Sequence, residues 1–174
     1  MTKREEIEKL LLKTDIKGMG GLILAMREGG FYEAPCSGKY HLAKAGGLAE
    51  HSLNVLSYMQ FLQDALEPKI PDRSIIICGL LHDLGKMGQY GKPNYIPAED
   101  GTYKTSRDLL YMDHEVRSVA IASKYIDLTE EEQWAITMHN GLYGAFADTI
   151  KGKETELYML LHFADMWCSR VVEK

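Results

Sequence analysis

Apolar residues recur every three to four positions along most of this chain of 174 residues, which is the spacing of amphipathic helices. Two capping boxes mark helix starts, Thr2 with Glu5 and Thr129 with Glu132. The sequence therefore predicts an all-α fold, a bundle of about six to seven helices. The expected helices cover residues 2–12, 22–28, 48–66, 73–86, 113–126, 129–139 and 154–172.

Glycine and proline residues mark the connections between these helices. Residues 31–47 are expected to form a loop, and Pro68 and Pro71 are expected to end the long helix before Asp72 caps the next one. That next helix is expected to break near Gly85.

Helical periodicity is lost between residues 88 and 108. Residues 94–96 and 102–104 flank Asp100-Gly101, which predicts a small β-hairpin between residues 94 and 104. No linker, repeat or low-complexity tract divides the chain. We therefore expect one domain over residues 1–174, with N-terminal helices in residues 1–35 and a core in residues 40–170.

Composition and charge narrow the class of protein. Hydrophobic residues make up 45% and charged residues 26%, which is typical of a globular domain. No apolar run approaches the ~20 residues of a membrane span, and the charged N-terminus has no secretory pattern. The net charge of −5 disfavours stable binding of duplex nucleic acid. Cys36, Cys78 and Cys168 lie far apart, which fits a reducing cytoplasm and argues against a thiolate zinc site.

Polar residues within the apolar helix stripes are the most informative feature. Asp83 shares a stripe with Ile76 and Leu80, and Asp165 and His51 lie on the apolar faces of their own helices. A buried carboxylate is costly unless a cation or hydrogen bonds compensate for its charge. These positions therefore suggest a metal ion in the core.

Six candidate ligands follow one another at intervals of about one helix and one connection. This is how helical bundles bring ligands together from facing helices. Six ligands exceed the need of one tetrahedral ion, so we expect two divalent transition-metal ions bridged by a carboxylate. The histidine-rich set favours iron or manganese, with magnesium, cobalt and nickel as alternatives. The candidate metal ligands are His51, His82, Asp83, His114, His139 and Asp165.

The segment LHDLGK at residues 81–86 resembles the signature of the HD-domain superfamily of metal-dependent phosphohydrolases. The segment GGLAEHS at residues 46–52 and Ala164-Asp165 complete the order of that family, and His114 and His139 match the additional histidines of its dinuclear members. The chain looks most like the HD module of bacterial three-prime-to-five-prime exoribonucleases over residues 40–170. It departs from that module at Asn140, where a second histidine is usual, and it has no OB domain.

The resemblance implies roles for individual residues. His51, His82, Asp83 and Asp165 would hold the first metal, and Asp83 would bridge to a second held by His114 and His139. Asp83 and Lys86 would be the catalytic residues.

Substrate-binding roles are also implied by the resemblance. Lys86 would contact a substrate phosphate, with His41 and Arg170 as further candidates, and the segment 88–108 would cover the site. Lys86 has a plainer alternative as a solvated lysine at a helix end. His162, one turn before Asp165, either supports the ligands or is a helix histidine with its own partner.

The expected function is hydrolysis of a phosphomonoester or phosphodiester by a metal-bridging hydroxide. The partner would be a small phosphorylated substrate, a nucleotide or short oligonucleotide, with no membrane involved and the oligomeric state open. Two alternatives belong to other classes: a mixed-valent di-iron oxygenase of the HD fold, and a module that senses a nucleotide without turning it over.

Overall fold

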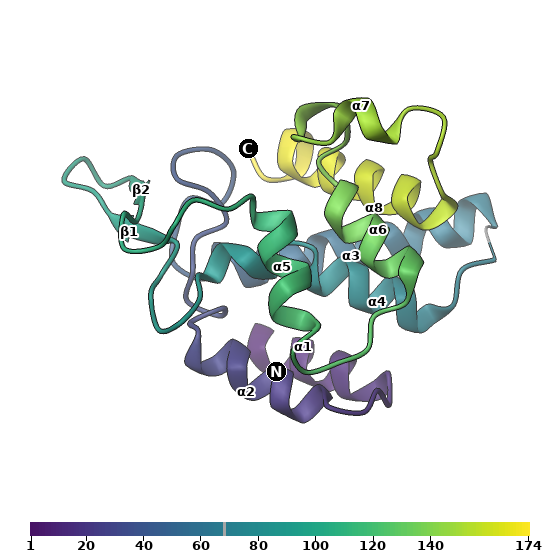
Figure 1. The fold of residues 1–174 in the computed structure, drawn as a ribbon, viewed down its shortest axis with the longest axis horizontal. Coiled ribbons are helices and arrows are strands. Elements are labelled where there is room, and N and C mark those ends of the chain that lie inside the picture. The colour runs from purple at the N-terminus through teal and green to yellow at the C-terminus, as the bar shows by residue number, and fades with distance from the viewer. Residues whose placement is uncertain (68) are drawn as a thin grey trace.

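The structure, a computed structural model, describes residues 1–67 and 69–174 and is mostly helical (Figure 1). Pro68, one of the two prolines expected to end the long helix, lies outside the described residues. The elements are, in order, α1 Lys3–Lys13, α2 Met19–Glu28, α3 Gly47–Leu66, α4 Asp72–Leu81, the 3-10 helix η1 Leu84–Met87, β1 Tyr95–Pro97, β2 Tyr103–Thr105, α5 His114–Ala122, α6 Glu130–Met138, the 3-10 helix η2 Gly141–Tyr143, α7 Ala147–Ile150, α8 Glu156–Trp167 and the π-helical turn η3 Cys168–Val172.

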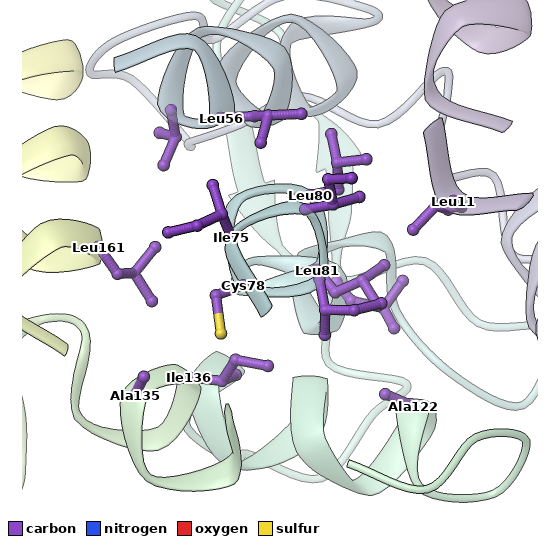
Figure 2. Close-up of a cluster of buried hydrophobic side chains, with 14 of the residues drawn as sticks. Leu11, Leu56, Ile75, Cys78, Leu80, Leu81, Ala122, Ala135, Ile136 and Leu161 are labelled. Atoms are coloured by element: carbon purple, nitrogen blue, oxygen red, sulfur yellow. The ribbon is translucent and has the colours of Figure 1, made fainter. Parts of the chain in front are cut away.

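Helix α4 lies at the centre of the hydrophobic core. Every residue from Ser74 to Leu81 is buried, and α4 packs against α1, α3, α6 and α8. Figure 2 shows side chains of α4 surrounded by Leu11, Leu56, Ile136 and Leu161 from those four helices. A helix that is apolar on all sides is stable only when buried on all sides, so α4 organises the bundle.

Gly79 permits the close approach of α3 and α4. A Cβ atom at this position would lie 2.9 Å from the Cα of Leu56 on α3. Because a glycine stands there, the turn of α3 that contains Leu56 and the C-terminal part of α4 lie side by side.

Both predicted capping boxes and the predicted hairpin are present. Thr2 and Thr129 accept from the backbone N–H groups of Glu5 and Glu132, whose carboxylates accept in return. β1 and β2 are antiparallel, with Ile96 opposite Lys104.

Helix α4 ends earlier than predicted. The prediction continued the helix to residue 86, but Asp83 has φ −101° and ψ 11°, and the chain goes on as η1. The reason is the close contact of η1 with α5, since a Cβ on Gly85 would clash with the backbone carbonyl of His114. At the start of α4, Pro71 occupies the N-cap position and Asp72 is already helical.

Other helix boundaries also differ from the prediction. α2 begins at Met19, α5 ends at Ala122, and the segment expected as a loop before α8 contains η2 and α7. Within the described residues, 1–67 and 69–174, no helix is both long enough and apolar enough to cross a membrane.

The last helix ends differently from the prediction of one helix to residue 172. α8 begins after the N-cap Thr155 and ends at Trp167, and η3 then widens the turn. The backbone N–H of Glu173 donates to the carbonyl of Cys168 at 3.0 Å, a span of five residues. As a result Val172 is 43% exposed, and the side chain of Glu173 turns inward.

The loop between α2 and α3 lies beside the hairpin (Figure 1). The N–H of Tyr103 donates to the carbonyl of Gly38 at 2.8 Å, and the N–H of Cys36 donates to the carbonyl of Leu42 at 3.2 Å. These bonds hold residues 36–42 in a tight turn that borders the cluster described next.

Candidate metal centre

All six predicted ligands lie in one interior cluster. His51 comes from α3, His82 and Asp83 from the turn after α4, His114 from the first position of α5, His139 from the end of α6 and Asp165 from α8. Their ring nitrogens and carboxylate oxygens approach within hydrogen-bonding or near-contact distances. Five chain segments therefore bring imidazole and carboxylate groups to one place, as the spacing predicted.

Asp83 lies at the centre of this cluster, and its two oxygens face different histidines. Oδ2 is 3.5 Å from the Nε2 atoms of both His51 and His82. Oδ1 is 3.1 Å from Nε2 of His114 and 3.5 Å from Nε2 of His139. A carboxylate in this arrangement can bridge two cations, one on each side.

Asp165 completes the half of the cluster that contains His51 and His82. Its Oδ1 lies 3.2 Å from Nε2 of His51, and the Nε2 atoms of His51 and His82 are 3.3 Å apart. Two imidazole nitrogens facing each other with carboxylates around them form a donor set for a borderline transition metal.

Oδ1 of Asp83 is buried and has no hydrogen-bond partner among the residues that the structure describes. A buried carboxylate oxygen without a partner is costly, and a cation between it and the nearby histidine nitrogens would compensate for its charge. The residues present therefore fit a metal centre.

Three of the four histidines direct Nε2 inward because Nδ1 has an acceptor outside the cluster. Nδ1 of His82 lies 3.1 Å from the carbonyl oxygen of Gly79, and Nδ1 of His139 lies 2.7 Å from that of Ile136. In His51 it lies 2.8 Å from Oε2 of Glu173. Carbonyls and carboxylates only accept, so Nδ1 carries a hydrogen and Nε2 is the nitrogen that can bind a metal once it holds no proton.

Glu173 is a residue that sequence reasoning missed. It is buried, and its Oε1 also accepts from Nδ2 of Asn54 at 2.9 Å. Nothing in the spacing of the sequence indicated Glu173, because only the wide η3 turn brings it to His51.

Asn140 reaches the half of the cluster that contains His114. Its Nδ2 donates to Oε1 of Glu115 and lies 3.5 Å from Nε2 of His114, while Oε2 of Glu115 lies 3.3 Å from Nδ1 of His114. The residue that departs from the exoribonuclease pattern thus still borders the second half of the cluster.

The charges of the cluster are set by burial and by its carboxylates. Burial alone would raise the pKa of Asp83, but Lys86, His82 and His114 outweigh it and hold the pKa well below its usual range. Burial lowers the pKa of His82 to about 3. Burial also disfavours charge on His51, yet Asp165 and Glu173 raise its pKa to about 9. The cluster therefore attracts positive charge at the position of His51.

Lys86 lies inside the site. Its Nζ is 2.6 Å from Oδ2 of Asp83, and only 12% of its side chain is exposed. The neighbouring Asp83 raises the pKa of Lys86 against the effect of burial. The alternative of a solvated lysine at a helix end is therefore wrong.

His41 and Cys36 border the same cluster. The Nε2 of His41 is 3.3 Å from Sγ of Cys36, and the rings of His41 and His51 are 5.1 Å apart between centroids. Cys36 is fully buried, and burial raises its pKa well above the usual value. The structure thus places a thiol beside the candidate metal ligands, where the sequence analysis expected none.

The remaining candidates lie outside the cluster. Arg170 is on the exposed surface, with its guanidinium carbon 5.3 Å from the centroid of the Tyr143 ring. His162 has its own partner, since its Nδ1 lies 2.8 Å from the carbonyl of His139, and its ring fills the space beside Gly141.

Comparison with known proteins agrees with this geometry. Residues 48–162 match the HD domain family. The chain is 33% identical over 143 residues to the dihydroneopterin 2',3'-cyclic phosphate phosphodiesterase of Methanocaldococcus jannaschii, which covers 80% of this chain. The chain spans about half, 53%, of the length of that relative. No solved structure matches the chain.

The family match covers five of the six clustered ligands and ends three residues before Asp165. Asp165 nonetheless lies against His51, so the structure adds this sixth candidate ligand to the five within the matched region. On the extent of the match and the geometry of the cluster, the chain belongs to the HD-domain family.

Proposed function

We propose that this protein is a metal-dependent phosphohydrolase that cleaves a phosphodiester. The position of Asp83 carries the proposal, because one carboxylate faces two pairs of histidines with its two oxygens. Such a bridging group is what a two-metal hydrolase needs to hold its ions at ~3.5–4 Å from each other.

Two groups of residues would hold the ions. The first ion would bind His51, His82, Asp83 and Asp165, and the second would bind Asp83 together with the ligands of the other half, His114 and His139. When bound, the ions supply a hydroxide of lowered pKa and positive charge for the phosphoryl oxygens. Four imidazoles favour iron or manganese over magnesium, which prefers oxygen ligands.

Lys86 and His41 are proposed to face the substrate. Lys86 holds Asp83 at 2.6 Å, and a cation on Asp83 would compete for the same oxygen and free the ammonium group for a substrate phosphate. His41 lies beside Cys36 and His51, on the loop that the hairpin holds. Arg170, whose side chain lies on the exposed surface, stays a prediction from the family resemblance.

The proposed substrate class is a small organic 2',3'-cyclic phosphate. The relative is named for hydrolysis of such a cyclic diester on a pterin. Nucleoside 2',3'-cyclic phosphates carry the same five-membered cyclic phosphate ring. They are therefore the substrates that agree both with the name of the relative and with the nucleotide expected from the sequence. A short oligonucleotide, suggested by the resemblance to exoribonuclease modules, is the second candidate.

The test combines metal analysis with turnover. Protein purified without chelator should contain a divalent transition metal, and with Mn²⁺ or Fe²⁺ it should open adenosine 2',3'-cyclic phosphate under anaerobic conditions. Asp83→Ala should lose both metal and turnover, because it removes the bridge. Asp148→Ala, which removes an exposed carboxylate on α7, should keep both.

Three results would contradict the proposal. Full activity of the Asp83→Ala protein would exclude the bridging role. Metal-replete wild type that turns over no phosphoester but consumes oxygen and shows an iron EPR signal would indicate the oxygenase. Metal-replete protein that is stabilised by a nucleotide without forming product would indicate the sensing module.

A further inference from the structure

A third group of donors lies next to the two halves of the proposed metal centre. It consists of Cys36, His41 and His51. The sulfur of Cys36 and one ring nitrogen of each histidine lie within 4.8 Å of one another. Neither Cys36 nor His41 belongs to the ligand set of the HD centre. The three residues come from two segments, the tight turn after α2 and the first turns of α3.

The turn holds Cys36 and His41 in place before any ion binds. The N–H of Cys36 donates to the carbonyl of Leu42, and Oγ of Ser37 donates to the carbonyl of His41 at 2.8 Å. Leu42 has a positive φ of 46°, which an L-residue adopts at a cost, so the turn is fixed by its surroundings. A preformed turn lowers the entropy lost when a ligand binds.

The distance between Cys36 and His41 agrees with a tetrahedral zinc site. In such a site, bonds of about 2.3 Å to sulfur and 2.0–2.1 Å to nitrogen place the sulfur and nitrogen ligands about 3.5 Å apart. Sγ of Cys36 and Nε2 of His41 are 3.3 Å apart. Oδ2 of Asp83 lies 3.9 Å from that sulfur and 3.5 Å from Nε2 of His51, but Lys86 engages this oxygen at 2.6 Å, so the protein supplies three donors to this site.

We propose that Cys36, His41 and His51 form a second site for a thiophilic cation, which overlaps the His/Asp centre at His51, with Zn²⁺ as the physiological candidate. On binding, the Cys36 thiol releases its proton to solvent and the thiolate sulfur bonds the ion, with no change in oxidation state. Thiolate ligands select zinc and cadmium over manganese and magnesium. The site therefore differs in metal preference from the His/Asp centre beside it.

The two sites exclude each other because they share one nitrogen. Nδ1 of His51 is engaged by Glu173, so Nε2 is the nitrogen left for a metal. A zinc ion held by Cys36 and His41 would take Nε2 away from the ion that Asp165 and His82 hold. Zinc would thus inhibit the hydrolase, and this consequence alone rests on the proposed function.

Cadmium is the probe for the site itself, because a bond from thiolate to Cd²⁺ absorbs in the ultraviolet and bonds to imidazole or carboxylate do not. Titration of chelator-treated wild type should produce this absorption and saturate at one equivalent. Cys36→Ser should abolish the band, and His41→Ala should weaken binding by more than about 100-fold, since loss of an outer partner alone costs roughly 10–100-fold. Cys168→Ala, which removes a thiol elsewhere, should keep the band.

Preloading with Mn²⁺ should raise the Cd²⁺ concentration needed for the band, because His51 is shared. The far-ultraviolet circular dichroism of each variant shows whether it is folded. A folded wild type that binds Cd²⁺ without the band, or a band that survives in Cys36→Ser, would overturn the site. Zinc inhibition of turnover that is equal in wild type and Cys36→Ser would overturn the inhibitory role and leave the proposed hydrolase intact.

Discussion

Each buried histidine of the cluster uses its two ring nitrogens for different purposes. In His82 and His139 the outer nitrogen donates to a backbone carbonyl within the same turn, whereas in His51 it donates to the carboxylate of Glu173. A carboxylate partner makes the inner nitrogen a stronger donor to a metal than a carbonyl partner does. His51 should therefore be the tightest histidine ligand.

Removing this carboxylate should weaken metal binding. Glu173→Gln keeps the size of the side chain and an oxygen acceptor but removes its charge, so the affinity for Mn²⁺ should fall roughly 10–100-fold. Isothermal titration calorimetry of chelator-treated protein measures this affinity. Glu154→Gln, an exposed change, should leave it unaltered. Equal Mn²⁺ affinity in wild type and Glu173→Gln would show that Glu173 does not position His51.

Lys86 should act on substrate and not on the metal. In Lys86→Ala the metal content should stay at the wild-type level, while kcat/KM for a cyclic phosphate should fall about 10²–10³-fold through lost charge stabilisation. Elemental analysis and steady-state kinetics on the same sample separate the two effects. Lys104→Ala, on the exposed side of the hairpin, is the control. Loss of metal from Lys86→Ala would contradict the assignment.

At the scale of elements, the contact between η1 and α5 decides where His114 lies. Gly85 donates its N–H to Oγ of Ser118 at 2.8 Å, and this hydroxyl donates to the carbonyl of His114 at 2.8 Å. The glycine of the LHDLGK segment is thus explained by packing, since it lets the first turn of α5 touch the turn that carries Asp83.

Gly85→Ala should separate these elements. The added methyl group would meet backbone atoms of α5, which cannot move away as a flexible side chain can, so stability should fall by about 1–3 kcal/mol. Denaturant unfolding measures the change, and binding of the second equivalent of metal should weaken with it. Gly20→Ala has open space around the new methyl and should stabilise α2 by about 0.5–1 kcal/mol. An unchanged midpoint for Gly85→Ala would show that the contact is not tight.

For the whole molecule, we expect folding and metal binding to be coupled through the cluster. Asp83, Asp165 and Glu173 gather negative charge in the interior, partly offset by Lys86 and the histidines. An ion that binds the folded chain and not the unfolded chain adds about 2.7 kcal/mol to the unfolding free energy at 100 times its dissociation constant.

Mn²⁺ should therefore raise the melting temperature of chelator-treated protein in a concentration-dependent way. Differential scanning calorimetry measures the shift, which should disappear in Asp83→Ala. A melting temperature that Mn²⁺ leaves unchanged would contradict the coupling. So would an equal shift in wild type and Asp83→Ala.

The sequence predicted the parts of this protein that depend on local patterns. Helical periodicity and the capping signals of Thr2 and Thr129 indicated the helices, since these signals act within a few residues. Asp83 and Asp165 stood out because charged residues on apolar stripes need a partner wherever they are buried. The boundaries were less predictable, as the end of α4 shows.

Contacts between distant segments were decided by the tertiary structure alone. The π-helical turn after α8 brings Glu173 to His51, and a tight turn brings Cys36 and His41 to the same histidine. The sequence by itself determined which polar side chains are buried together. Packing between segments far apart in the chain decided which groups orient these side chains and which thiol lies beside them. Such contacts do not produce a periodic pattern in the sequence, so the sequence could not indicate them.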